Sequence, residues 1–109
     1  MKRGDTVTVA AGSGYGSKPR PAVVLQGDAF SGLNSVILAL FTTTDAATAK
    51  VRCRIAPDAA NGLREQSDLM VDILITVPRD RIGKVIGHLS AADMARAETA
   101  LLTVLGFAR

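Results

Sequence analysis

The chain has 109 residues, the length of one domain, which leaves no room for a tandem array or a second catalytic domain. Its 48% hydrophobic content is enough to fill one core and excludes a disordered or fibrous chain, while its single cysteine excludes an intramolecular disulfide or a structural zinc site. The net charge of +3 comes from the first half, because residues 1–54 carry seven Lys or Arg against three Asp. A surface that binds a polyanion is therefore expected mainly there.

No segment of the sequence suits export or membrane insertion. The longest apolar run, residues 36–41, is far shorter than the roughly 20 residues of a membrane-spanning helix. Lys2 and Arg3 could open a signal peptide, but polar and apolar residues alternate after them instead of forming its apolar core. We therefore expect a cytoplasmic protein.

Short strands are predicted over most of the chain. We expect them over residues 6–10, 21–26, 35–43, 50–55, 67–77 and 82–89. A loop with three glycines, residues 11–19, separates the first two strands. This loop does not match a nucleotide-binding pattern, because Ser17 stands where a glycine is needed and Pro19 prevents a helix from opening there.

The end of the chain has helical periodicity. Ser90 and Asp93 match a capping box, apolar residues then recur at helical spacing, and Gly106 ends the pattern, so a helix is predicted over residues 91–105. Short strands followed by one helix indicate a mainly β domain, a small and strongly bent antiparallel sheet or barrel capped by the helix. The whole chain, residues 1–109, is expected to form this single domain.

Basic side chains provide the first candidate site residues. Arg20 stands between Pro19 and Pro21, which fix the backbone and project its guanidinium from a defined place. Lys50, Arg52 and Arg54 alternate along one predicted strand face and could follow an extended single-stranded nucleic acid, or they could form a solvated outer face.

The other candidates are single side chains. Asp72 interrupts an apolar run, so its carboxylate should have a basic partner, either in a structural ion pair or in an active site. Thr42 lies at the threonine-rich end of a predicted strand, where it could present its hydroxyl to a ligand, but from the residues alone an ordinary strand threonine is favoured. His88 is expected to be structural or solvated, and Cys53 to be a buried, inert thiol.

Several segments together resemble the MazF/PemK toxins. They are the KRGD opening at residues 2–5, the PRPAVVL segment at 19–25 and ALFT at 39–42, in that family's order. The last strand and helix also resemble it, at residues 81–82, 87–90, 94 and 105–106. The resemblance covers almost the whole chain, and the arginine-proline strand after the KRGD opening is its most specific element.

The resemblance implies a small SH3-like antiparallel β-barrel with a C-terminal helix, a homodimer and a cognate antitoxin partner. The implied activity is sequence-specific cleavage of single-stranded RNA, commonly mRNA, to a 2′,3′-cyclic phosphate and a 5′-hydroxyl, without metal or cofactor. Arg20 and Thr42 match the family's catalytic residues, and Asp72 corresponds to an acid near the scissile phosphate. Tyr15 and Lys18, in the glycine loop, are expected to bind RNA, Tyr15 by stacking on a base.

The sequence departs from the family pattern near Asp72. Met70 replaces a basic residue, and Ile75 replaces the arginine of an Arg-Thr pair. Two alternatives to the nuclease are a non-catalytic SH3-like module that binds RNA or protein, which these departures favour, and a gyrase-poisoning toxin of the same superfamily. The second alternative relies on a tryptophan near the C-terminus, and this chain has none.

Overall fold

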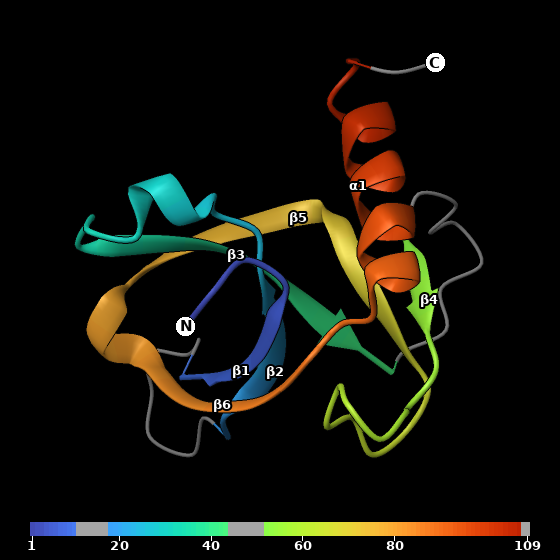
Figure 1. Ribbon diagram of the computed structural model, residues 1–109, viewed down its shortest axis with the longest axis horizontal. Coiled ribbons are helices and arrows are strands. Elements are labelled where there is room, and N and C mark those ends of the chain that lie inside the picture. Colours follow the sequence, from blue (N-terminus) through green and yellow to red (C-terminus); the bar gives the residue numbers. More distant parts are fainter. Residues whose placement is uncertain (11–17, 44–51, 108–109) are drawn as a thin grey trace.

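The described strands all join one antiparallel sheet with the order β4–β5–β3–β2–β1–β6 (Figure 1). The computed structural model describes residues 1–10, 18–43 and 52–107. The strands are β1 (Asp5–Val9), β2 (Arg20–Val24), β3 (Ser35–Thr42), β4 (Cys53–Ile55), β5 (Ser67–Pro78) and β6 (Ile82–His88). Two short 3-10 helices, η1 (Asp28–Phe30) and η2 (Arg79–Arg81), lie between strands, and α1 (Ala91–Val104) follows β6.

The six predicted strands and the predicted helix are therefore confirmed, with ends that mostly shift by one or two residues. The fourth strand differs most, because the structure describes it only from Cys53 and its first predicted residues lie outside the described ranges. Within β4, Cys53 and Ile55 are buried and Arg54 is exposed, as the alternation predicts.

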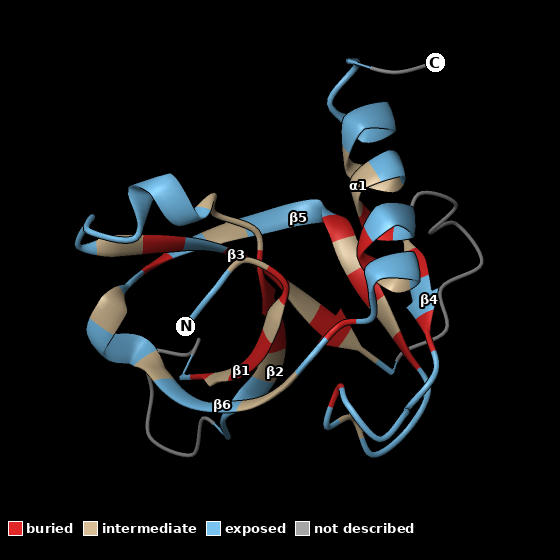
Figure 2. Cartoon of the chain, in the orientation of Figure 1, coloured by how far each residue is buried: buried red, intermediate tan, exposed pale blue. Residues whose placement is uncertain are grey.

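The central strand β3 contributes side chains to two cores, one on each face of the sheet, which explains most of its unbroken apolar sequence. Alternate residues of β3 enter two separate cores: Ala39 and Phe41 pack with β4, β5 and α1, whereas Val36 and Leu38 pack with β1 and β2. Figure 1 shows β5, η2 and β6 curving around β1 and β2, so the bent sheet encloses the second core itself. Figure 2 shows buried positions concentrated in the central strands.

Local sequence signals set both ends of α1. At its start the Asp93 amide donates to the Ser90 hydroxyl at 3.0 Å. At its end Gly106 has a φ of +84°, and its N–H donates to the Thr103 carbonyl while the Phe107 N–H donates to the Leu102 carbonyl. These two bonds form a Schellman motif, which requires the left-handed glycine. Among the described residues no helix is long and apolar enough to cross a membrane.

Candidate functional site

A cleft of about 750 Å³ lies where the ends of β2 and β3 meet the segment before β5. This volume is within the roughly 300–1,000 Å³ of ligand pockets. We call its lining residues on and next to these two strand ends the strand group: Lys18, Pro19, Arg20, Pro21, Phe41, Thr42 and Thr43. Those around the segment before β5 are the loop group: Gly62, Leu63, Arg64, Glu65 and Ser67. Thr8 of β1 and Ile86 of β6 complete the lining.

Strand register brings Arg20 and Thr42 to the same cleft. Ala22 lies opposite Leu40 in the β2–β3 pair. The same register continued by two residues places Arg20, the first residue of β2, beside Thr42, the last residue of β3. Two candidates that are far apart in the chain therefore meet at neighbouring strand ends, and both line the cleft.

The Arg20 side chain is exposed and is held by a stiff backbone. Pro19 and Pro21 flank it, and Pro21 lies opposite Thr8 in the β1–β2 pair. Within the part of the chain that the structure describes, neither the Arg20 side chain nor the Lys18 side chain forms a hydrogen bond or ion pair. The two cations are therefore available to an anion, and the planar guanidinium suits a phosphate in particular.

The loop group is positioned by Asn61, a polar residue with no exposed surface. Its side chain donates to the Ala56 carbonyl at 2.9 Å and accepts from the amides of Asp58 and Leu63 at 3.2 and 3.0 Å. Its own carbonyl accepts from the Thr6 hydroxyl at 2.7 Å, which ties the loop to β1. All of these bonds need the native loop conformation, so Asn61 fixes the backbone that leads into the cleft.

Two glycines let this loop approach β6 closely. Gly62 has a φ of +71°, and a Cβ there would collide with the Ile86 carbonyl. A Cβ on Gly87 would collide with the Ala60 carbonyl. The loop group is therefore held against β6 by backbone contacts that larger residues would prevent.

The arginines around β4 are each paired with an acid of β5. Arg54 lies opposite Asp68, and its Nε donates to that carboxylate at 3.0 Å. The Arg52 side chain, only 15% exposed, forms an ion pair with Asp72 at 3.6 Å, and its buried Nε has no hydrogen-bond partner among the described residues. The predicted basic partner of Asp72 is thus confirmed, and Arg52 does not belong to a solvated face. None of these four side chains lines the cleft.

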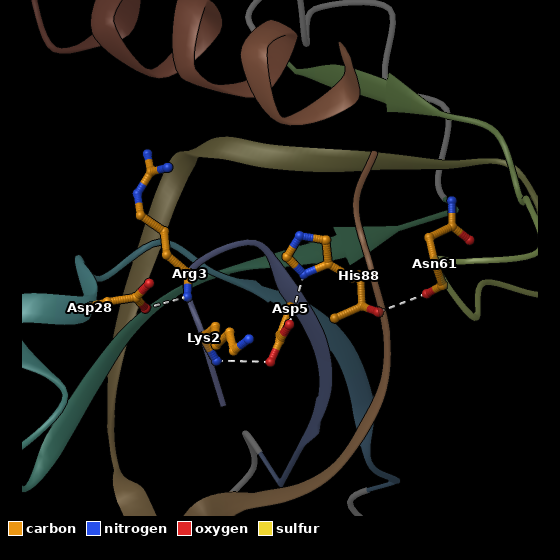
Figure 3. Close-up of polar contacts among 7 residues, drawn as sticks. Lys2, Arg3, Asp5, Asp28, Asn61 and His88 are labelled. Atoms are coloured by element: carbon orange, nitrogen blue, oxygen red, sulfur yellow. Dashed lines mark hydrogen bonds and ion pairs between the residues drawn. The ribbon is translucent and has the colours of Figure 1, made fainter. Parts of the chain in front are cut away.

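A second polar cluster lies between the start of β1 and the end of β6 (Figure 3). The Asp5 carboxylate, 13% exposed, contacts His88 Nδ1 at 2.7 Å and accepts from the Lys2 amide at 2.8 Å. Burial alone would raise the pKa of Asp5, but these hydrogen bonds and the charges of His88 and the N-terminus outweigh it and hold that pKa below its ordinary value. His88 is both structural and solvated, the two descriptions that the sequence left open, because it holds Asp5 while its side chain is 54% exposed. Its amide also donates to the Ala60 carbonyl.

The remaining predicted residues fall into two groups. Cys53 is buried, and burial raises the pKa of its thiol, which agrees with the inert thiol predicted. Tyr15 and Lys50 lie outside the described residues. Across residues 1–10, 18–43 and 52–107, no group of three or more His, Cys, Asp or Glu side chains could hold a metal ion.

Sequence reasoning missed the loop group entirely. The Asn61-Gly62 pair, between the predicted strands at 50–55 and 67–77, was the available signal, because this dipeptide is typical of turns with positive φ. Arg64 and Glu65, the charged members of the loop group, follow it directly. Nothing in their own sequence pattern indicates that they would lie at the same cleft as Arg20.

Comparison with known proteins identifies the family and the fold of the chain. A model of the PemK-like, MazF-like toxins of type II toxin-antitoxin systems matches residues 2–105. A protein of Mycolicibacterium smegmatis described as a probable endoribonuclease MazF is 44% identical over 108 residues, 99% of each chain.

Solved structures share the fold. The Mycobacterium tuberculosis toxin MazF-mt6 superposes with a TM-score of 0.79 at 24% identity, covering 96% of this chain and 99% of that one. A mycobacterial endoribonuclease, solved in complex with its cognate antitoxin, gives 0.78 at 21% identity and covers 100% and 96%. The small antiparallel barrel with a C-terminal helix is therefore confirmed.

Proposed function

Because the chain belongs to the PemK/MazF family of toxins from type II toxin-antitoxin systems, we propose that it cleaves single-stranded RNA at selected sequences, without a metal ion, through Arg20 and Thr42. As a MazF-like toxin the protein is an endoribonuclease. The observation that carries the proposed site is the meeting of these two residues, one from each strand end, at one cleft.

The proposed reaction is transfer of a phosphodiester to the neighbouring ribose. The 2′-hydroxyl oxygen loses its proton and attacks the adjacent phosphorus, while the bond to the 5′-oxygen breaks and that oxygen takes up a proton. The products end in a 2′,3′-cyclic phosphate and a 5′-hydroxyl. Negative charge grows on the phosphoryl oxygens during this step. The planar Arg20 guanidinium, fixed between two prolines, donates to these oxygens. Thr42 adds a neutral hydrogen bond from the neighbouring strand.

Other charged side chains have lesser parts in the proposal. Lys18 and Arg64 attract the RNA backbone into the cleft, and Arg54, with Tyr15 and Lys50, extends the contact outside it. The family resemblance gives Asp72 a place near the scissile phosphate, but its side chain lies outside the cleft and is paired with Arg52. We therefore give Asp72 a structural ion pair in this proposal and no direct contact with the phosphate.

The proposal also covers partners and location. A cognate antitoxin would restrain the toxin, and the toxin would act in the cytoplasm, where messenger RNA is found. A homodimer is part of the proposal. Exposed apolar side chains on β3, on β5 and just after α1, among them Ile37, Leu74 and Phe107, support it by offering apolar surface to bury.

The test is incubation of the purified protein and its Arg20→Ala variant with a long single-stranded RNA of mixed sequence in the presence of EDTA. We expect discrete cuts with 5′-hydroxyl ends from the native protein and almost none from the variant. Intact RNA, cuts that need a divalent ion, or equal cutting by the variant would each contradict the proposal.

A further inference from the structure

Glu65 is the one acidic side chain among the described residues that line the cleft. The cations Lys18, Arg20 and Arg64 line the same cleft. Yet the Glu65 carboxylate has neither a hydrogen bond nor an ion pair within residues 1–10, 18–43 and 52–107, and its side chain is exposed. Folding therefore gives this carboxylate no partner in the described part of the chain, although cations line the same cleft.

The backbone at Glu65 is held on both sides. Two residues further on, the Ser67 hydroxyl donates to the Glu65 carbonyl at 3.0 Å, and Ser67 itself begins β5. On the other side the loop is fixed at Asn61 and Gly62. When a ligand binds, the side-chain torsions of Glu65 must still be ordered, but its contact requires little further ordering of the backbone.

The chemistry of a carboxylate limits what it can contact on RNA. An ionised carboxylate only accepts hydrogen bonds and is repelled by phosphates, so it is suited to the donor groups of a base. Single-stranded RNA exposes the Watson–Crick edges of its bases. Guanine presents two adjacent donors there, N1–H and the N2 amino group, which match the two oxygens of a carboxylate. Adenine and cytosine present one amino group, and uracil presents one N–H between two carbonyl oxygens that repel a carboxylate.

Resting on the proposed endoribonuclease function, we propose that Glu65 recognises one base next to the scissile phosphate and selects guanine, disfavouring uracil most strongly. The cations lining the cleft then hold the RNA backbone. Glu65 contributes specificity because its carboxylate attracts the donor groups of guanine and repels the carbonyl oxygens of uracil. The loop group is in this way the part of the cleft that chooses the cut site, while Arg20 and Thr42 act on the phosphate at any sequence.

The experiment maps the cut sites of the native protein, Glu65→Gln and Glu65→Ala on a pool of random-sequence RNA by sequencing the 5′-hydroxyl fragments. We expect the native protein to show guanine enriched and uracil depleted at one position fixed relative to the cut. In Glu65→Ala the guanine-over-uracil ratio should fall by about 5- to 150-fold, the range of a bidentate base contact. Glu65→Gln, with one acceptor and one donor, should shift the preference toward bases that offer both.

A short RNA that carries inosine in place of that guanine gives a second measurement. Inosine lacks only the N2 amino group, so kcat/KM of the native protein should fall about tenfold, the effect of one hydrogen bond to a charged group. Glu65→Ala should cleave the guanine and inosine substrates equally. This double comparison assigns the contact to one atom pair and does not depend on the absolute activity of the variant.

Two control variants separate charge from recognition. Arg64→Ala, next to Glu65, should lower kcat/KM by the same factor whichever base stands at the selected position. The dependence of kcat/KM on salt concentration should also weaken. Asp80→Asn, an exposed acid of η2 outside the cleft, should change neither rate nor preference.

Each outcome bears on a different part of the proposal. An unchanged base preference in Glu65→Ala would overturn the role of Glu65. The role of Glu65 would also be overturned if Glu65→Ala lost the same rate at every sequence and lost the acidic limb of its pH–rate profile. That result would make Glu65 a general base instead. A native protein that cuts without distinguishing guanine from uracil would overturn only this inference. RNA left intact by the native protein would remove the proposed function and this inference with it.

Discussion

The two parts of the cleft owe their positions to different physical causes. The strand group extends a regular sheet, so the β2–β3 register alone places Arg20 beside Thr42. The loop group has no ladder to follow and depends on one buried asparagine and on two glycines that allow close approach to β6. One part is thus fixed by a repeated pattern and the other by a few specific contacts.

This difference suggests a division of labour. A cation that must meet a phosphate oxygen at any RNA sequence benefits from the stiffest support, and a strand end between two prolines provides it. A residue that selects a base can stand on a loop, because loops change their sequence without changing the sheet. Mutations in the two groups should therefore have separable effects, on rate in one and on stability or preference in the other.

The largest effect is expected at Arg20. Removing a preorganised donor to a charged transition state typically costs about 10²- to 10³-fold in kcat. The exposed guanidinium has no partner in the described part of the chain, so Arg20→Ala should unfold at the same denaturant concentration as the native protein. Single-turnover cleavage and urea unfolding measure the two quantities. Arg20→Lys is the matched control, because it keeps the charge but loses the planar fork, and its rate should lie between the two. A stable Arg20→Ala with native rate would contradict the role given to the strand group.

The loop group should fail first at Asn61. Asn61→Ala leaves one carbonyl and two amides, all in partly buried bonds, without their partners, so we expect a loss of about 2 kcal/mol in the free energy of unfolding. Urea denaturation measures it, and Asp58→Ala, at an exposed position of the same loop, should cost less. In Asn61→Ala molecules that stay folded, the base preference at the cut site should weaken. Adding Arg20→Ala to this variant should still remove most of the cleavage. Native stability in Asn61→Ala would show that the loop does not rest on this residue.

Thr42 should show a smaller effect on the rate than Arg20. Thr42→Val keeps the shape of the side chain and removes the hydroxyl, so kcat should fall by about tenfold, the equivalent of one neutral hydrogen bond. The control is Thr76→Val, at an exposed threonine of β5 outside the cleft, which should keep the native rate. If Thr42→Val also kept the native rate, Arg20 would be the only catalytic member of the strand group.

The same difference between the two groups decided what the sequence could predict. Period-two alternation and capping residues are local signals, and they located the six strands and the helix closely. The meeting of Arg20 and Thr42 followed from a family resemblance, because register between distant strands is not visible in one sequence. Asn61 and Glu65 depend on contacts with β1, β5 and β6 that no local pattern encodes. The partner of Asp72 was predictable as a cation, but its identity as Arg52 came only with the fold.

The smallest expected effect lies behind the loop group, at Asp5. Its carboxylate holds His88, whose amide donates to Ala60 in the loop that carries Asn61. Because the pKa of Asp5 is lower in the folded protein than in the unfolded chain, the ionised carboxylate stabilises the fold at pH values above about 4, and this stabilisation is lost as the pH falls through the folded pKa.

Asp5→Asn should therefore lower the free energy of unfolding by about 1 kcal/mol at pH 7, the scale of one hydrogen bond, and this difference should shrink as the pH falls below 4. Urea unfolding at a series of pH values gives both curves, and Asp80→Asn controls for the loss of one negative charge at an exposed site. An Asp5→Asn curve that runs parallel to the native one at every pH would mean that the carboxylate supports the loop by shape alone. If the loss of stability in Asp5→Asn instead grows as the pH rises from below 4 toward neutral, the charge of Asp5 helps to hold the loop group in place. The strand group contains no acid and needs no such support.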